Sequence, residues 1–217
     1  MKTKRLVIFF LVIVACSTAI QAQKTNSPYL FNDFENAKVY FSNGQQSDEK
    51  VNYHLLSNKI RFIDRKDQQI KEVSDTKIID SIKIGDRIFI PNANESWMEI
   101  LSATPLIQVQ YLVNTKTKGQ VAAYGGTSEL SNTKSYIAKK GNENISILKD
   151  MEFEVASYYN YYWIMKDGKR KQFKSFAQFL KLYPKQKDAL NQYIQNNHIN
   201  FEDTEAIVKL CLYAENL

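Results

Sequence analysis

The hydrophobic pattern of this 217-residue chain changes its period once, near residue 174. Between residues 38 and 113 apolar and polar side chains alternate, most clearly from Ile107 to Val113, where Gln108 and Gln110 fill polar positions. Strict alternation predicts strands that are buried on one face, which is typical of an antiparallel sheet. From residue 176 onward the apolar positions recur every three or four residues, which predicts helices.

Turn residues divide the alternating region into short strands. Asn43-Gly44 and Gly85-Asp86 separate neighbouring apolar pairs, as expected for hairpin turns. The stretch at 115–144 is rich in Gly, Ser, Thr, Asn and Lys and predicts a long loop, which is either disordered or functional.

A hairpin and three helices complete the chain. We expect the hairpin at 161–173. Ser175 and Gln178 form a capping-box pair for the first helix, Pro184 suits the first turn of the second, and Asp203 can cap the third. The apolar positions of the first and third helices are Phe176, Phe179, Leu180, Tyr183, Ala206, Ile207, Leu210, Cys211 and Ala214.

Together these patterns predict an α+β fold. An antiparallel β-meander body would occupy 34–173, and three short C-terminal helices would form a tail at 175–217. Each helix is too short to be stable alone, so the apolar stripes must pack on one another or on the sheet.

The first 22 residues have the features of a secretory signal peptide. Lys2, Lys4 and Arg5 precede an unbroken apolar run at 6–15, which is too short to span a bilayer. We therefore expect an exported protein, periplasmic or secreted, with a flexible polar lead-in at 23–33.

Two processing sites overlap at the end of this segment. Cleavage after Ala22 would release a soluble chain that begins at Gln23. The alternative is a lipobox at 13–16, in which Cys16 is lipidated and becomes the first mature residue. A membrane contact is expected only through this anchor.

Composition narrows the classes of function. The net charge of +6 falls to +3 without the signal, because 29 basic residues less three leaves 26 against 23 acidic ones. This ordinary balance argues against a nucleic-acid partner. Cys16 and Cys211 are the only cysteines, so no disulfide is expected within the mature chain.

Several segments of the chain look familiar. They are IKIGDRIF at 82–89, AYGGTS at 123–128, YWIMKDGK at 162–169, FAQFLKLYP at 176–184, INF at 199–201 and IVKL at 207–210. Together they resemble a family of uncharacterised exported bacterial proteins with a β-rich body and a three-helix C-terminal tail. The resemblance implies a location and a layout, and it assigns no site residue.

Residues with catalytic or metal-binding potential are few. His54 and His198 are far apart in sequence and belong to no metal-binding motif. Cys211 lies on the apolar stripe of the last helix, which favours a buried structural thiol. Glu152 and Glu154 would share a strand face, but alternation explains them as solvated side chains. We therefore expect no catalytic residue, no metal and no cofactor.

An aromatic run followed by basic residues is the most unusual feature. In a strand it would make both faces aromatic, although core packing needs only one. The candidate partner or ligand surface is Tyr158, Tyr159, Tyr161, Tyr162, Trp163, Lys169, Arg170 and Lys171. Packing against the C-terminal helices is the alternative explanation for these side chains.

The sequence favours a non-enzymatic binding or structural module of the cell envelope, with an unknown envelope protein or a glycan as its partner. The alternatives are a hydrolase-type enzyme with scattered site residues and a carrier of a small apolar ligand within a curved sheet. A deep cleft with converging acids or histidines would favour the enzyme, and a shallow aromatic surface would favour binding.

Overall fold

The computed structural model describes residues 27–92, 95–117 and 153–217. Ten strands form one antiparallel sheet in the order β10-β9-β8-β7-β6-β5-β1-β2-β3-β4. In chain order the elements are β1 (Glu35–Phe41), β2 (Gln46–His54), β3 (Lys59–Ile63), β4 (Ile70–Glu72), η1 (Thr76–Ile78), β5 (Ile79–Ile84), β6 (Arg87–Pro91), β7 (Trp97–Ala103), β8 (Leu106–Thr117), β9 (Phe153–Lys166), β10 (Lys169–Phe173), α2 (Phe176–Leu182), α3 (Lys187–Asn196) and α4 (Thr204–Glu215). The predicted α+β meander with three C-terminal helices is confirmed.

Three sequence predictions fall outside the described residues. They are the signal peptide at 1–22, the lipidation site Cys16, and the loop from residue 118 to 144. The first residues assigned to that loop, 115–117, are the end of β8.

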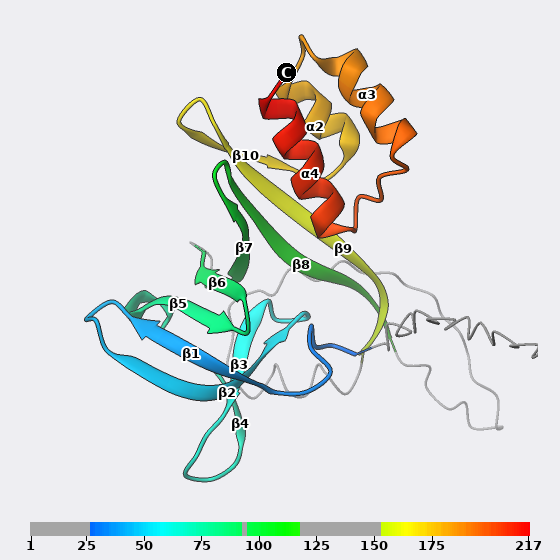
Figure 1. The fold of residues 1–217 in the computed structure, drawn as a ribbon. Helices are drawn as coiled ribbons and strands as arrows, with labels where there is room; N and C mark the ends of the chain where they lie inside the picture. The colour runs from blue at the N-terminus through cyan, green and yellow to red at the C-terminus, as the bar shows by residue number, and fades with distance from the viewer. Residues whose placement is uncertain (1–26, 93–94, 118–152) are drawn as a thin grey trace, which may run out of the picture.

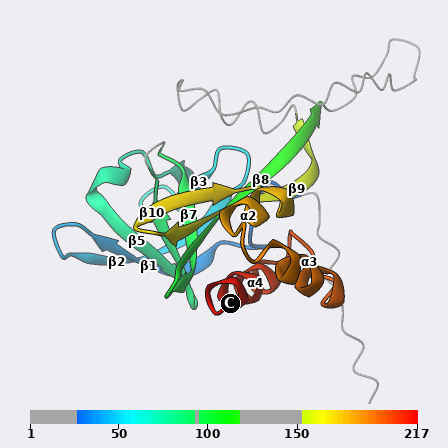
Figure 2. The same cartoon turned by 90° about the horizontal axis from the view of Figure 1, so that it is seen from above.

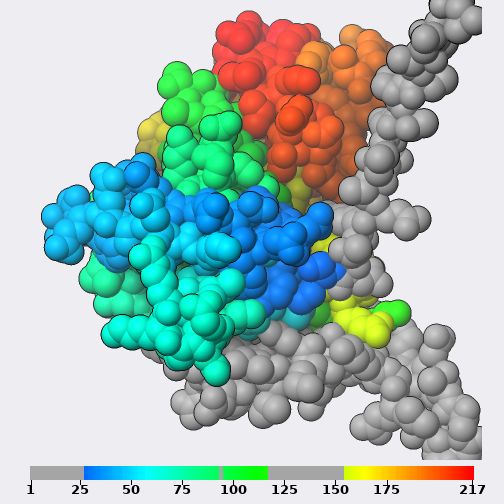
Figure 3. All heavy atoms as spheres, turned by 60° about the horizontal axis from the view of Figure 1, so that its bottom comes forward, coloured from blue at the N-terminus to red at the C-terminus, as the bar shows by residue number. Residues whose placement is uncertain are grey.

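The helices and the N-terminal strands lie at opposite ends of the described molecule (Figures 1 and 3). Seen from above, α2, α3 and α4 lie on one side of the long β8–β9 ribbon (Figure 2). Among the described residues, no helix covers the other face of this ribbon.

Two cores lie along the sheet. In the first, β1–β3 and β5–β8 curl around Tyr53, Phe89 and Trp97, which are fully buried. The curl brings the two ends of this segment together, because the Trp97 amide donates to the carbonyl oxygen of Asn58 at 3.0 Å. In the second core, Tyr162 and Phe173 of the sheet pack against the helices. Tyr111 contacts both cores and links them.

Turn geometry decides which side chains of β6 face the first core. The two-residue turn at Gly85 and Asp86 places Ile84 directly opposite Arg87 and Ile82 opposite Phe89. Phe89 is therefore buried, whereas Ile88 is 38% exposed. The turn is possible because Gly85 adopts a φ of +58°, where a β-carbon would be strained.

A buried ion pair lies in the first core. The Arg87 guanidinium donates through Nε and Nη2 to both oxygens of Glu99, each at 2.7 Å, and the Tyr111 hydroxyl also donates to Glu99. The guanidinium carbon is 4.8 Å from the ring centroid of Phe31 and 5.3 Å from that of Phe89. Burial lowers the pKa of Arg87, but the hydrogen bond to Glu99 and nearby negative charge outweigh burial, so the pKa is raised overall. The hydrophobic pattern of the sequence does not predict this cluster of Arg87, Glu99 and Tyr111.

The end of the lead-in, at residues 30–33, is hydrogen-bonded to β2. The Leu30 amide donates to the Tyr53 carbonyl at 3.0 Å, and the Asn52 amide group donates to the carbonyl oxygens of Phe31 and Asp33, both at 2.9 Å. The lead-in at 23–33 was expected to be flexible, but the part of it at 27–33 is ordered. The physical reason is that Asn52 is buried and needs these partners.

The helix ends agree with the sequence at two places and differ at a third. Ser175 accepts from the Gln178 amide at 3.3 Å, and Asp203 accepts from the Glu205 and Ala206 amides at 3.0 and 3.1 Å. Pro184 does not begin the second helix, because α3 starts at Lys187 after an Gln186 N-cap that makes no side-chain bond. Pro184 instead follows the end of α2.

Candidate ligand-binding face

Strand β9 divides the aromatic run between its two faces. Tyr162 points into the second core and is fully buried, with its hydroxyl donating to the Phe201 carbonyl at 2.9 Å. Burial raises the pKa of Tyr162, so the hydroxyl remains a donor. On the same side, the Tyr158 hydroxyl donates to the Ser27 carbonyl at 3.0 Å. Tyr162 is therefore a core residue, and its assignment to a ligand surface was wrong.

Tyr159, Tyr161 and Trp163 lie on the opposite face, away from the helices. The ring centroids of Tyr159 and Tyr161 are 5.5 Å apart. Cations of the neighbouring hairpin strand lie above two of the rings: Lys174 Nζ is 5.4 Å from the Tyr161 centroid, and Arg170 Cζ is 5.0 Å from the Trp163 ring. Cation–π contacts of this kind hold long cationic side chains in place.

Two of the predicted basic residues lie elsewhere. Lys171 is paired with the core residue Ile164, and Lys169 is paired with Lys166. Since Lys166 Nζ lies 3.8 Å from the Tyr183 ring at the end of α2, this row faces the helices. Lys169 and Lys171 are therefore exposed on the helix side of β10. They do not belong to the surface that contains Tyr161 and Trp163, although the sequence had suggested that they would. Alternation counted from the buried Phe173 would have revealed this.

Glutamines border the aromatic row. Gln108 and Gln110 of β8 are paired with Trp163 and Tyr161, and Gln172 of β10 is paired with Trp163 from the other side. We call the combined surface the aromatic platform. Its members are Tyr159, Tyr161, Trp163, Arg170, Lys174, Gln108, Gln110 and Gln172.

The amide groups of the platform are not committed to the fold. Within the described part of the chain, the side chains of Gln108, Gln110 and Gln172 make no hydrogen bond, although Gln108 is only 5% exposed. The same holds for the Trp163 indole N–H and the Tyr161 hydroxyl. The amide atoms of Gln108 are not among the fully buried, unpaired polar atoms, so they can bond to water or to a ligand.

Charge on the platform is positive. Arg170 donates to Asn92 Oδ1 at 3.3 Å and contacts the Met98 sulfur, which fixes its guanidinium across the end of the face. Burial lowers the pKa of Arg170, yet a guanidinium stays charged at any physiological pH. No member of the platform is acidic, so the face attracts anions.

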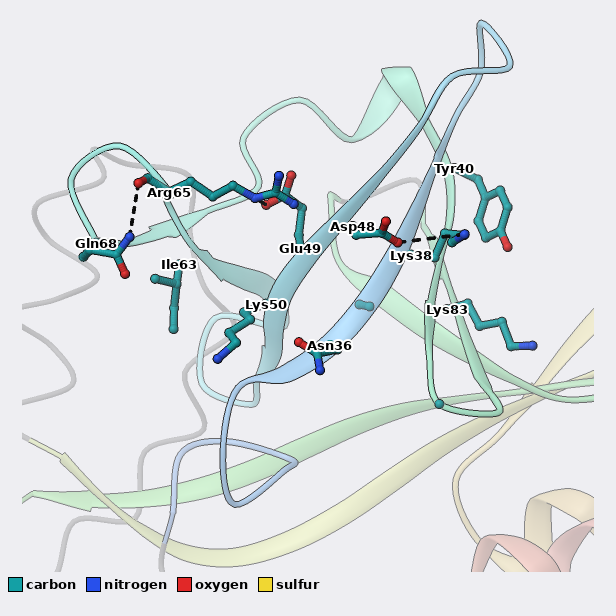
Figure 4. Close-up of a pocket in the computed structure, with 12 residues that line it drawn as sticks. Asn36, Lys38, Tyr40, Asp48, Glu49, Lys50, Ile63, Arg65, Gln68 and Lys83 are labelled. Carbon is teal, nitrogen blue, oxygen red and sulfur yellow. Dashed lines mark hydrogen bonds and ion pairs between the residues drawn. The ribbon is translucent and has the colours of Figure 1, made fainter.

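An open groove on the N-terminal strands is the other surface of note (Figure 4). It has a volume of about 870 Å³ and is lined by residues of β1, β2, β3 and β5 and of the turns that join these strands. Two ion pairs use its acids: Lys38 with Asp48 at 3.9 Å and Arg65 with Glu49 at 3.5 Å. Figure 4 shows the lysines spread along the sheet without converging on one point. The groove thus offers no assembled acid–base pair.

The remaining candidate residues do not form a catalytic group. His54 is buried in β2, where its Nδ1 lies 2.9 Å from the Ser57 hydroxyl, whereas His198 is exposed after α3. Glu154 pairs with Lys116 at 3.5 Å, and Glu152 lies outside the described residues. Cys211 is fully buried, which confirms the predicted buried thiol, and burial raises the pKa of that thiol to about 12. Across 27–92, 95–117 and 153–217 no cluster of three or more His, Cys, Asp or Glu side chains could hold a metal ion.

Comparison with known proteins adds no relative. No family model, curated protein or solved structure matches the chain. In the described segments, no helix combines the length and the hydrophobicity needed to cross a bilayer.

Proposed function

We propose that this protein is an exported, non-enzymatic binding module of the cell envelope, and that the aromatic platform is its binding surface. The observation that carries the proposal is the row of Tyr159, Tyr161 and Trp163 on the face of β9 opposite α2, α3 and α4, next to Arg170 and Lys174. Core packing does not need this row, because the helices are served by Tyr162, Ile164 and Phe173 on the other face.

Physical chemistry supports binding at such a surface. Tyr, Trp and Arg dominate the energetics of recognition because they combine large apolar area with polar groups. The cation–π contacts order Arg170 and Lys174 before a ligand arrives, which reduces the entropy lost on binding. Export follows from the signal-like first 22 residues, and Cys16 is proposed as the lipid anchor if the lipobox is processed.

A catalytic function has weaker support. Hydrolysis by paired carboxylates or by a metal needs converging acids or histidines. In the described residues the groove acids are paired with cations. His54 ends β2 and His198 follows α3, and Figure 1 shows these two elements at opposite ends of the molecule. The half-buried aromatic row of β9 is the feature that favours binding over catalysis.

Sedimentation with native envelopes tests the proposed function. Purified protein should sediment with an envelope preparation, and Tyr161→Ala and Trp163→Ala should each reduce the bound fraction about tenfold. Tyr40→Ala, a substitution of a half-buried tyrosine in the groove, should leave it unchanged. Equal sedimentation of all four proteins would refute binding at the platform.

A further inference from the structure

We infer that the ligand of the platform is an acidic glycan, an oligosaccharide whose sugars carry carboxylates. The inference rests on the proposed function, since it names the ligand class of the same surface. Three features of the platform support it: the row of aromatic rings, the glutamine amides beside the rings that make no hydrogen bond within the described residues, and the two cations that contact the rings.

The floor matches the apolar faces of sugar rings. Alternate residues of one strand are about 7 Å apart, so Tyr161 and Trp163 present their rings in a row along β9. Such a row can pack against the C–H faces of successive sugars of one chain, over the parts of the rings that Arg170 and Lys174 leave uncovered. A single small molecule would use only one of the rings.

The amides match sugar hydroxyls. An amide carries both donors and an acceptor, and a hydroxyl is likewise both donor and acceptor. Gln108 and Gln110 line one side of the aromatic row and Gln172 the other, and none has a side-chain hydrogen bond within the described residues. An apolar protein anchor on this surface would remove these amides from water without giving them a partner, which disfavours such an anchor.

The cations select an anionic sugar. Arg170 and Lys174 lie above the rings of Trp163 and Tyr161, and the platform contains no carboxylate to neutralise them. A carboxylate on a stacked sugar would approach these groups from the solvent side and form charge-assisted hydrogen bonds. A neutral glycan would form no ion pair with Arg170 or Lys174.

Calorimetric titration of the purified protein separates stacking from charge. The probes are an oligogalacturonate, a malto-oligosaccharide of equal length as the neutral sugar, and poly-L-glutamate of equal charge as the polyanion without sugar rings. We expect the oligogalacturonate to bind at least about tenfold more tightly than either of the others.

Variants then assign the binding to the platform. Tyr161→Ala should weaken oligogalacturonate binding about tenfold, and Arg170→Gln should weaken it about fivefold and reduce its salt dependence. Lys83→Gln in the groove is the matched control for charge and should have no effect. Circular dichroism of each variant checks that the fold is kept.

Two results would overturn the inference. Poly-L-glutamate that binds as tightly as the oligogalacturonate would show generic attraction of anions, and equal binding of the neutral sugar would remove the role of the cations. Should envelope sedimentation still depend on Tyr161 while no oligosaccharide binds, the acidic-glycan inference fails and the proposed binding function stands.

Discussion

At the scale of single residues, the Arg87–Glu99 pair is one of the largely buried ion pairs of the described chain. Glu99 is 5% exposed, and its oxygens accept from Arg87 and from Tyr111, the residue that contacts both cores. Removing one partner of a buried pair leaves the other charge without compensation, which is the costly case.

Glu99→Gln should therefore destabilise the protein by about 2–3 kcal/mol, near the lower end for a buried pair because 34% of the Arg87 side chain is exposed. Urea denaturation measures this change. The matched control is Asp48→Asn, which breaks the exposed pair with Lys38 and should cost less than about 1 kcal/mol. Equal costs for the two substitutions would mean that Glu99 has no special role.

Cys211 gives a second prediction at this scale. The thiol is fully buried among the apolar residues of the second core. A thiol reagent at pH 8 should label it only as fast as the protein unfolds, and Cys211→Ser should cost about 1–3 kcal/mol by burying a hydroxyl. Labelling within seconds of mixing with native protein would show that the residue is accessible.

The same thiol makes stability depend on pH. Its folded pKa of about 12 lies above the value of about 8.5 in an unfolded chain. The unfolded state therefore loses the proton first, and the contribution of Cys211 is complete below pH 8.5 and is lost as pH rises toward 12, by up to about 1.4 kcal/mol per pH unit. Cys211→Ala lacks this term, so the stability gap between the two proteins should narrow at high pH; a constant gap would contradict the buried thiol.

At the scale of elements, helix capping provides the cleanest comparison. Asp203 accepts two backbone amides at the start of α4, whereas Gln186 at the start of α3 accepts none. Asp203→Ala should lower stability by about 1 kcal/mol, and Gln186→Ala should be nearly neutral. Thermal denaturation of both variants decides the matter, and a larger loss for Gln186→Ala would contradict the assigned caps.

Local sequence patterns predicted the strands and helices. They did not always predict which face of a strand is buried. Period-two alternation and the capping residues Ser175 and Asp203 were sufficient for the elements, because they act within a few neighbouring residues. The side of β6 that is buried depends on the length of the Gly85–Asp86 turn, which alternation alone does not register. On β10, by contrast, alternation counted back from the core residue Phe173 does place Lys169 and Lys171 on the helix side.

At the scale of the whole molecule, the C-terminal helices and the sheet share one core. Phe173 lies between Tyr162, at 5.4 Å between ring centroids, and Phe179 of α2, at 5.1 Å. Phe179→Ala should therefore lower stability by about 3–5 kcal/mol in a single thermal transition. A second, unchanged transition in calorimetry would show that the tail folds by itself.

The candidate site was only partly visible in the sequence. The aromatic run identified the strand, but only pairing across β8, β9 and β10 divides it into core and platform and brings Gln108, Gln110 and Lys174 to the same face. Such long-range register is set by the whole sheet, so no local pattern contains it.

The two tryptophans allow the central claim to be measured directly. Trp97 is fully buried in the first core, and Trp163 belongs to the aromatic platform. In an ¹⁵N-labelled sample each contributes one indole N–H signal, which can be followed while a digest of native envelopes is added. We predict that the Trp163 signal shifts or broadens while the Trp97 signal stays in place; binding that moves the Trp97 signal, or neither signal, would contradict the platform as the binding surface.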